Sequence, residues 1–258
     1  MAGSGPRSSM TVARQALLPA LAALLLGGCG ALRPATVPIR TVAIESGGSG
    51  RCLAVLLPGR FAAPEGFAKG KFGEAVRERG LDLDVIAVDA HLGYYRTRTV
   101  LERVREDVIL PARAKGYDQV WLVGTSLGGL GSLLALRDHP EDLSGVLAIA
   151  SFLGDDDVLR EIEAAGGPRL WKPPAEIAQN DIGRNIWGWL STGEVADAKV
   201  PVHVGWGTSD DFDRSNRMLA SLLPPDRTYT ASGAHDMETW NRVWTQFLDR
   251  VGPCRKNR

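Results

Sequence analysis

A serine lies between two glycines at the point where an apolar run changes into a helix-like one. The segment from residue 121 reads WLVGTSLGGLGSLLA, and Gly124 to Gly128 form a G-x-S-x-G pattern around Ser126. In a strand–turn–helix context, this pattern holds a serine hydroxyl on a sharp turn where a ligand can reach it. Ser126 is therefore a candidate nucleophile, although in a chain with 30 glycines the pattern alone does not decide its role.

A serine hydroxyl is a poor nucleophile near neutral pH and needs a base within hydrogen-bond reach. The chain has four histidines. His235, in TASGAHDMETW, follows the last strand-like run and precedes the last helical one, so its loop can hold an imidazole over Ser126. His203 lies inside a strand-like run, His139 is at the opposite edge of the sheet, and His91 precedes the serine. We therefore expect His235 to be the base.

An acidic residue must fix the tautomer of such a base and stabilise the imidazolium that forms. The stretch GWGTSDDFDR, directly after a strand-like run, supplies Asp210, Asp211 and Asp213. We expect Asp210 to be the acid, with Asp211 as its nearest competitor. A second candidate set, Asp155 to Asp157, follows the preceding strand-like run.

The surrounding pattern brings these residues to one edge of a sheet. Strand-like runs cover 41–46, 52–58, 83–90, 119–126, 145–151, 200–207 and 227–232. Helical patterns cover 67–80, 96–116, 127–137, 215–223 and 237–251. Apolar strands separated by helices indicate an α/β fold with a mostly parallel central sheet flanked by helices. Ligands bind outside the carboxyl ends of such strands, where Ser126, Asp210 and His235 each follow a strand.

Residues 152–198 interrupt the alternation of strands and helices. This segment has no strand pattern, but it holds Trp171, Trp187 and Trp189. Insertions of this length are rarely structureless, so we expect a small helical cap over the carboxyl edge of the sheet. Its tryptophans either anchor the cap by packing or line a substrate site.

The order Ser126, Asp210, His235, each on its own loop after a strand, resembles the arrangement in α/β-hydrolases. Over residues 41–251 the chain looks like a serine esterase of that superfamily. The ending GAHDMETWNRVW is similar to the GxHxWxxW ending of esterases related to esterase D, with Met237 in place of the more usual tryptophan, and GTSDDF resembles their acid loop. The resemblance implies an α/β-hydrolase fold and cleavage of carboxylic esters through an acyl-enzyme, without a cofactor.

The oxyanion of such a reaction needs hydrogen-bond donors, typically two backbone N–H groups. Leu127 follows the nucleophile at the start of a helix and would supply the first. The second would come from Pro58-Gly59-Arg60-Phe61, after a strand-like run, where Arg60 is the first choice and Phe61 the next. Many members of the family have His-Gly at this point, and this chain keeps only the glycine.

The N-terminus predicts export and a lipid anchor. Arg7 and Arg14 precede the apolar run at 16–26, which is shorter than the ~20 residues of a membrane span but fits a secretory signal. The run ends in LGGC, which resembles a bacterial lipobox and implies acylation of Cys29. The alternative is an ordinary signal peptide with a chance cysteine.

A lipid anchor would divide the chain into a lipoprotein signal peptide at 1–28, a tether at 29–40 and a hydrolase domain at 41–258. The protein would then lie in the bacterial cell envelope, held on a membrane outside the cytoplasm. Such a compartment permits a disulfide between Cys52 and Cys254, the two cysteines that remain. The alternative is one buried and one loose thiol.

The composition argues against several other classes of protein. The formal net charge is zero, so no basic surface suggests nucleic acid. The chain has no phosphate-cradling GxxxxGK loop and no CxxC metal motif, so we expect no nucleotide or metal partner. The expected partner is a small-molecule ester. A non-catalytic envelope binding protein on the same scaffold is the alternative, and a peptidase, thioesterase or acyltransferase of this fold also stays open.

Overall fold

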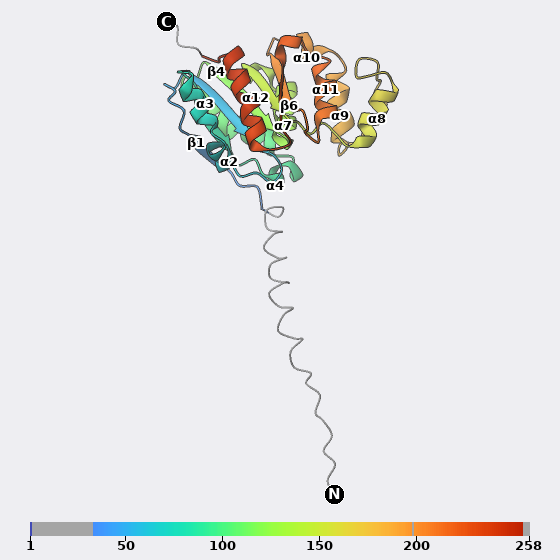
Figure 1. The fold of residues 1–258 in the computed structure, drawn as a ribbon, viewed down its shortest axis with the longest axis horizontal. Helices are drawn as coiled ribbons and strands as arrows, with labels where there is room; N and C mark the ends of the chain where they lie inside the picture. The colour runs from blue at the N-terminus through green and yellow to red at the C-terminus, as the bar shows by residue number, and fades with distance from the viewer. Residues whose placement is uncertain (2–32, 198, 255–258) are drawn as a thin grey trace.

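A seven-stranded sheet with the order β1-β3-β2-β4-β5-β6-β7 forms the centre of the molecule (Figure 1). The structure is a computed structural model that describes residues 1, 33–197 and 199–254. The strands are β1 (Thr41–Ile44), β2 (Cys52–Leu57), β3 (Asp84–Val88), β4 (Gln119–Thr125), β5 (Gly145–Ile149), β6 (Val202–Gly207) and β7 (Thr228–Ala231). β1 is antiparallel to β3, and all other neighbouring pairs are parallel. The mostly parallel sheet expected from the apolar runs is confirmed.

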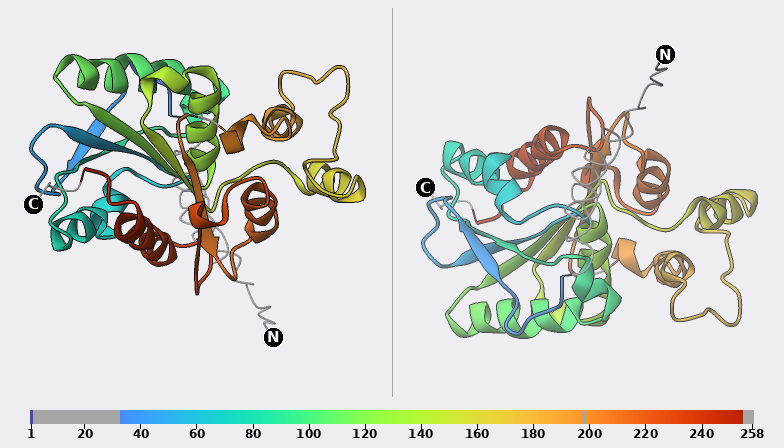
Figure 2. Two further views of the ribbon diagram at one scale, coloured as in Figure 1. Left: turned by 90° about the horizontal axis from the view of Figure 1, so that it is seen from above. Right: turned by 90° about the horizontal axis from the view of Figure 1, so that it is seen from below.

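Helices cover both faces of this sheet. The helices α3 and α12 lie on one face, and α5, α6 and α7 lie on the other (Figure 2). The α-helices are α2 (Glu65–Lys69), α3 (Phe72–Glu78), α4 (Leu92–Arg96), α5 (Val100–Val104), α6 (Leu110–Ala114), α7 (Leu127–Asp138), α8 (Asp156–Ala164), α9 (Ile182–Leu190), α10 (Glu194–Asp197), α11 (Asp213–Ala220) and α12 (Met237–Arg250). Two short 3₁₀ turns, η3 (Pro140–Asp142) and η4 (Pro225–Arg227), complete the connections.

The helix expected over 96–116 is divided into several pieces. A π-helical turn, η2 (Arg105–Ile109), separates α5 from α6, and α4 ends at Arg96. Pro111 has no N–H to donate to the carbonyl four residues earlier, so the regular α-helical ladder cannot continue through this point. The wider π turn directly before α6 accommodates the break.

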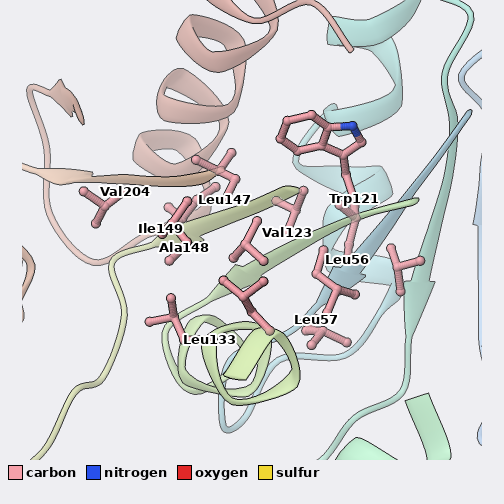
Figure 3. Packing of buried hydrophobic residues seen from close by; sticks show 14 of the residues in the cluster. Leu56, Leu57, Trp121, Val123, Leu133, Leu147, Ala148, Ile149 and Val204 are labelled. Carbon is pink, nitrogen blue, oxygen red and sulfur yellow. The ribbon is translucent and has the colours of Figure 1, made fainter. Parts of the chain in front are cut away.

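The core lies between the sheet and the two helical layers. In Figure 3, Leu133 of α7 lies against one face of the sheet, while Trp121 of β4 points away from that helix. The Trp121 ring packs on Phe247 of α12, with ring centroids 5.4 Å apart. A Cβ on Gly145 of β5 would lie 2.1 Å from the Trp121 ring, so the neighbouring strand leaves room for the indole only by having a glycine there.

The insertion between β5 and β6 is helical, as expected. It contains α8, α9 and α10, which lie at the end of the molecule away from β1 (Figure 1). Trp187 is fully buried, and its Nε1 donates a hydrogen bond to the Leu153 carbonyl at 2.6 Å. Trp171 is also buried and donates to Glu161 at 2.9 Å. These two tryptophans therefore anchor the insertion by packing.

Residues 33–40, which we call the strap, lie against the domain before β1 begins. The strap corresponds to the later part of the predicted tether, and its Ile39 is buried. Residues 2–28 of the predicted signal peptide, and Cys29, lie outside the described residues. Within the part of the chain that the structure describes, none of the helices has the length and apolar character needed to cross a membrane.

A disulfide joins the two ends of the domain. It links Cys52, the first residue of β2, to Cys254 after α12, with Cα atoms 6.2 Å apart. The two cysteines are 202 residues apart in the sequence. The bond lies at the amino ends of the parallel strands, on the edge of the sheet opposite Ser126.

Candidate active site

Ser126 occupies a strained turn between β4 and α7. Its φ is +55° and its ψ is −118°, a conformation that residues with a side chain rarely adopt. A Cβ on Gly124 would lie 2.0 Å from the carbonyl oxygen of Gly128, and a Cβ on Gly128 would lie 2.1 Å from that of Leu57. The turn therefore requires glycine at both ends of the G-x-S-x-G pattern.

The imidazole of His235 is hydrogen-bonded to the carboxylate of Asp210. Nδ1 of His235 lies 3.0 Å from each carboxylate oxygen, and the Phe212 N–H donates to Oδ1 at 2.8 Å. The Asp210 side chain is 0% exposed, and that of His235 is 23% exposed. When Nδ1 donates to a carboxylate, the neutral ring keeps Nε2 as a free acceptor. This is the tautomer that a general base requires.

Two aromatic rings hold the His235 imidazole from its sides. The ring centroids of Phe212 and Trp240 each lie 4.9 Å from that of His235, at interplanar angles of 86° and 83°. No role was predicted from the sequence for either residue, although Trp240 stands at the second tryptophan of the GxHxWxxW-like ending. Phe212 comes two residues after Asp210, and Trp240 lies near the start of α12. Their packing on the His235 ring reveals what they do.

A short series of contacts connects Ser126 to the His235 loop. The Ser126 carbonyl accepts a hydrogen bond from the Phe152 N–H at 3.2 Å. The Phe152 ring packs on Phe212 at 5.6 Å between centroids, and Phe212 packs on His235. Among the described residues, the Ser126 hydroxyl has no hydrogen-bond partner, so Oγ is not bonded to Nε2 of His235. Catalytic hydrogen bonds are often long before substrate binds and tighten in the complex.

Two backbone amides near Ser126 are candidates for binding an oxyanion. Leu127 is the first residue of α7, so its N–H has no acceptor within the helix. The loop after β2 comes close to the serine, since a Cβ on Gly59 would lie 3.1 Å from Ser126 Cβ and 3.6 Å from its Oγ. Arg60 is the next residue in this loop, and its guanidinium carbon lies 5.0 Å from the centre of the Phe61 ring.

The other acidic residues considered from the sequence have different environments. Asp211 is exposed to solvent. Asp213 accepts a hydrogen bond from Trp206 Nε1 at 2.6 Å and pairs with Arg217 at 2.8 Å. Asp157, in the second candidate set, lies 3.4 Å from an arginine of α9 and is also largely exposed. Among these residues, Asp210 is the one that contacts His235.

The remaining histidines serve the fold. His203 is buried in the core, and its Nδ1 lies 3.1 Å from the Tyr229 hydroxyl. His91 accepts a hydrogen bond from the Gly93 N–H at 3.1 Å and so caps the start of α4. His139 is 42% exposed and lies at the far edge of the sheet, after α7.

Comparison with known proteins identifies the fold. Est1E from Butyrivibrio proteoclasticus is 16% identical, with a TM-score of 0.56, and the match covers 85% of this chain and 98% of that one. A bacterial membrane phospholipase A is 17% identical, with a TM-score of 0.54 and coverage of 93% and 97%. S-formylglutathione hydrolase (FrmB) from Staphylococcus aureus is 12% identical, with a TM-score of 0.54 and coverage of 84% and 97%. No family model and no curated protein sequence matches the chain. Together with the sheet order, these likenesses show that the chain has the α/β-hydrolase fold.

Proposed function

We propose that this protein is a serine hydrolase that cleaves carboxylic esters through an acyl-enzyme on Ser126. The observation that carries the proposal is the His235–Asp210 pair, in which a buried carboxylate binds Nδ1 and leaves Nε2 as the free acceptor. The strained turn at Ser126 supports it, because this backbone conformation is retained only where surrounding structure enforces it. The α/β-hydrolase fold supports it in general terms, since the S-formylglutathione hydrolase FrmB has a similar fold.

The proposed reaction has two stages. Nε2 of His235 takes the hydroxyl proton of Ser126 while Oγ attacks the ester carbonyl carbon. The negative charge that forms on the carbonyl oxygen is stabilised by the Leu127 N–H and by a second backbone amide, for which Arg60 is the candidate. The imidazolium then gives its proton to the leaving alcohol, so the acyl group remains on Ser126. A water molecule, deprotonated by His235, releases the carboxylic acid and restores the serine.

The first test is Ser126→Ala. We expect it to remove hydrolysis of a short-chain aryl ester, because no nucleophile remains, and to leave the circular dichroism spectrum and the denaturation midpoint nearly unchanged. The matched control is Ser132→Ala on the same helix, where the hydroxyl donates to the Gly128 carbonyl at 3.0 Å and has no other partner among the described residues. Full activity in the Ser126 variant, or equal loss in both variants, would contradict the proposal.

One observation favours a second candidate, a non-catalytic binding protein on the same scaffold. The Ser126 hydroxyl is not hydrogen-bonded to His235, and a binding protein would have no need of that bond. A fluorophosphonate probe separates the two, because it reacts only with an activated serine. Labelling that is lost in Ser126→Ala supports the hydrolase, whereas an unlabelled wild-type protein supports the binding protein.

Ester, thioester and amide analogues of one acyl group then rank esterase, thioesterase and peptidase activity.

We also propose that the protein is anchored in the bacterial envelope by acylation of Cys29. The support is the sequence pattern alone, an apolar run that ends in LGGC. Several acyl chains on one residue meet the requirement for stable anchoring. We expect Cys29→Ser to abolish the lipid mass on the N-terminal peptide, measured by mass spectrometry, with Cys52→Ser as the control that keeps it. An unmodified Cys29 in the wild-type protein would refute the anchor.

A further inference from the structure

The strap crosses the same edge of the sheet as the candidate active site. Arg33 donates two hydrogen bonds to the carboxylate of Asp89, at 3.2 and 2.5 Å, and Asp89 directly follows β3. The Asp89 N–H donates to the Arg40 carbonyl at 2.8 Å, where the strap leads into β1. Because β2, β3 and β4 are parallel, the end of β3 lies on the same edge as Ser126 at the end of β4. The strap therefore fastens the chain beside the site.

The contact between Arg33 and Asp89 acts as a clamp. The Asp89 side chain is 4% exposed, and that of Arg33 is 47% exposed. Burial alone would raise the pKa of Asp89, but hydrogen bonds and positive charge from Arg33 and Arg40 hold this pKa below its usual value. Removing the partner of a buried charge is strongly unfavourable. A Cβ on Gly93 would lie 2.2 Å from the Arg33 carbonyl oxygen, so the strap passes this point with no space to spare.

Further contacts hold the strap along its length. The Tyr94 hydroxyl donates to the Thr36 carbonyl at 3.0 Å and accepts from the Thr36 N–H at 3.1 Å. The N–H of the buried Ile39 donates to Asp107 at 2.8 Å. These partners come from α4 and from the π turn η2, so two separate elements hold the strap in addition to the clamp.

The clamp limits how far the domain can lie from the proposed lipid anchor. An extended chain spans at most about 3.6 Å per residue, so Arg33 lies within about 14 Å of Cys29. If the chain were free as far as Arg40, the corresponding limit would be about 40 Å. The strap therefore keeps the carboxyl edge of the sheet close to the membrane that holds the anchor.

The same edge carries exposed side chains that suit a membrane surface. Phe61, in the loop after β2, is 77% exposed, and Val37, in the strap, is 73% exposed. Arg60 lies over the Phe61 ring, and the Arg40 side chain is 52% exposed, although it also pairs with Glu65 and Asp89. Apolar side chains insert at the boundary between headgroups and acyl chains, and arginines bind anionic headgroups. Apolar and basic groups thus occur together where the chain leads toward its anchor.

We propose that this edge, formed by the strap and the loop at 58–61, lies on the membrane surface and presents the candidate active site to esters held in the bilayer. The orientation rests on the proposed anchor at Cys29, and the substrate class rests on the proposed hydrolase activity. The amino ends of the strands, where the Cys52–Cys254 disulfide lies, face away from the membrane.

Hydrogen exchange tests the orientation without any need for turnover. The lipidated protein is bound to vesicles of phosphatidylethanolamine and phosphatidylglycerol, and the full-length Cys29→Ser protein in solution is the reference. We expect slower exchange at 59–62 and 92–98 on vesicles, with no change at 47–50 and 116–118 on the opposite edge. Protection confined to the opposite edge, equal protection of both edges, or none at either edge would overturn the orientation.

A linker insertion tests the functional consequence. About thirty Gly and Ser residues placed between Ala31 and Leu32 keep the anchor, the strap and the site but free the domain to turn. We expect the rate with a long-chain ester embedded in vesicles to fall by about fivefold or more, because the site is no longer held at the surface. The rate with a water-soluble short-chain ester should be unchanged.

The control carries the same insertion directly after Cys254, at the opposite edge, and both of its rates should match the wild type. An unchanged rate with the embedded ester in the first variant, or an equal loss in the control, would overturn the proposal. If the wild-type protein hydrolyses neither ester, the proposed activity fails and with it the proposed substrate class, while hydrogen exchange still decides the orientation.

Discussion

At the scale of single residues, the candidate chemistry depends on which ring nitrogen of His235 carries the proton. Asp210 has no exposed side-chain surface, so water does not compete for the carboxylate that binds Nδ1. The Phe212 N–H holds Oδ1 from the other side, which fixes the direction in which the carboxylate points. Phe212 and Trp240 then limit rotation of the imidazole. These contacts favour a single tautomer and a single ring orientation.

Asp210→Asn tests this account. An asparagine can still accept the Phe212 N–H, but its amide group would face Nδ1 as a donor, so the ring would place its proton on Nε2 and lose its ability to act as a base. We expect kcat for ester hydrolysis to fall by about 10³- to 10⁴-fold with little change in stability. Asp211→Asn, at the exposed neighbouring position, should keep nearly full activity, and steady-state kinetics of both variants provide the comparison. If the Asp211 variant lost the activity instead, the acid would be misassigned.

At the scale of secondary-structure elements, the close approach of β2, β4 and α7 shapes the turn at Ser126. The start of α7 lies so near the end of β2 that Gly128 has no room for a side chain beside the Leu57 carbonyl. The geometry of the turn therefore comes from packing of a helix against two strands. A change in that packing would move the serine and the Leu127 N–H together.

Gly128→Ala is expected to disturb both stability and activity. Its Cβ would lie 2.1 Å from a backbone oxygen, so α7 or β2 must shift, and we expect a loss of about 2 to 4 kcal/mol in the free energy of unfolding. Gly188→Ala in α9 is the control, because a Cβ there has its nearest neighbours at 3.8 Å and alanine favours the helix by about 0.5 to 1 kcal/mol. Urea unfolding measures both. An equally stable Gly128 variant would show that the turn does not depend on this contact.

At the scale of the whole molecule, folding buries a histidine that belongs to no catalytic group. His203 lies 6% exposed in β6, packed against Phe247 of α12 with ring centroids 5.2 Å apart. Burial, with a smaller repulsion from Arg227, lowers the pKa of His203 to about 4. Since an unfolded histidine has a pKa of about 6.5, the unfolded chain binds this proton more readily than the folded one.

The stability of the protein should therefore fall as the pH decreases. Above about pH 6.5, His203 is neutral in both the folded and the unfolded chain, so it does not reduce stability. Between about pH 6.5 and pH 4 the unfolded chain binds the proton and the folded chain does not, and the resulting loss of stability reaches about 3 kcal/mol at pH 4. We expect His203→Gln to reduce this acid-dependent loss, whereas His139→Gln, at an exposed position, should preserve it. Urea unfolding at pH 7.5, 5.5 and 4.5 measures the difference. An identical pH dependence in wild type and His203→Gln would contradict the assignment.

The α/β architecture and the set of candidate residues could both be predicted from the order of residues along the chain. Apolar runs and their spacing depend only on near neighbours in the chain, so the strands and the turn at Ser126 could be predicted well. The helix over 96–116 was less well predicted, because the break at the π turn depends on how the helix accommodates Pro111. The order of Ser126 and His235 along the chain also followed from the sequence, because each loop comes directly after a strand.

Which of these groups come into contact depends on the folded chain. It brings Asp210 rather than Asp211 to His235, it adds Phe212 and Trp240 around the ring, and it joins the distant Cys52 and Cys254. It also turns part of the expected tether into a strap that lies beside the site. Apart from the Trp240 contact, these features join segments far apart in the sequence, and their distances depend on how the whole sheet packs, which no local pattern of residues records.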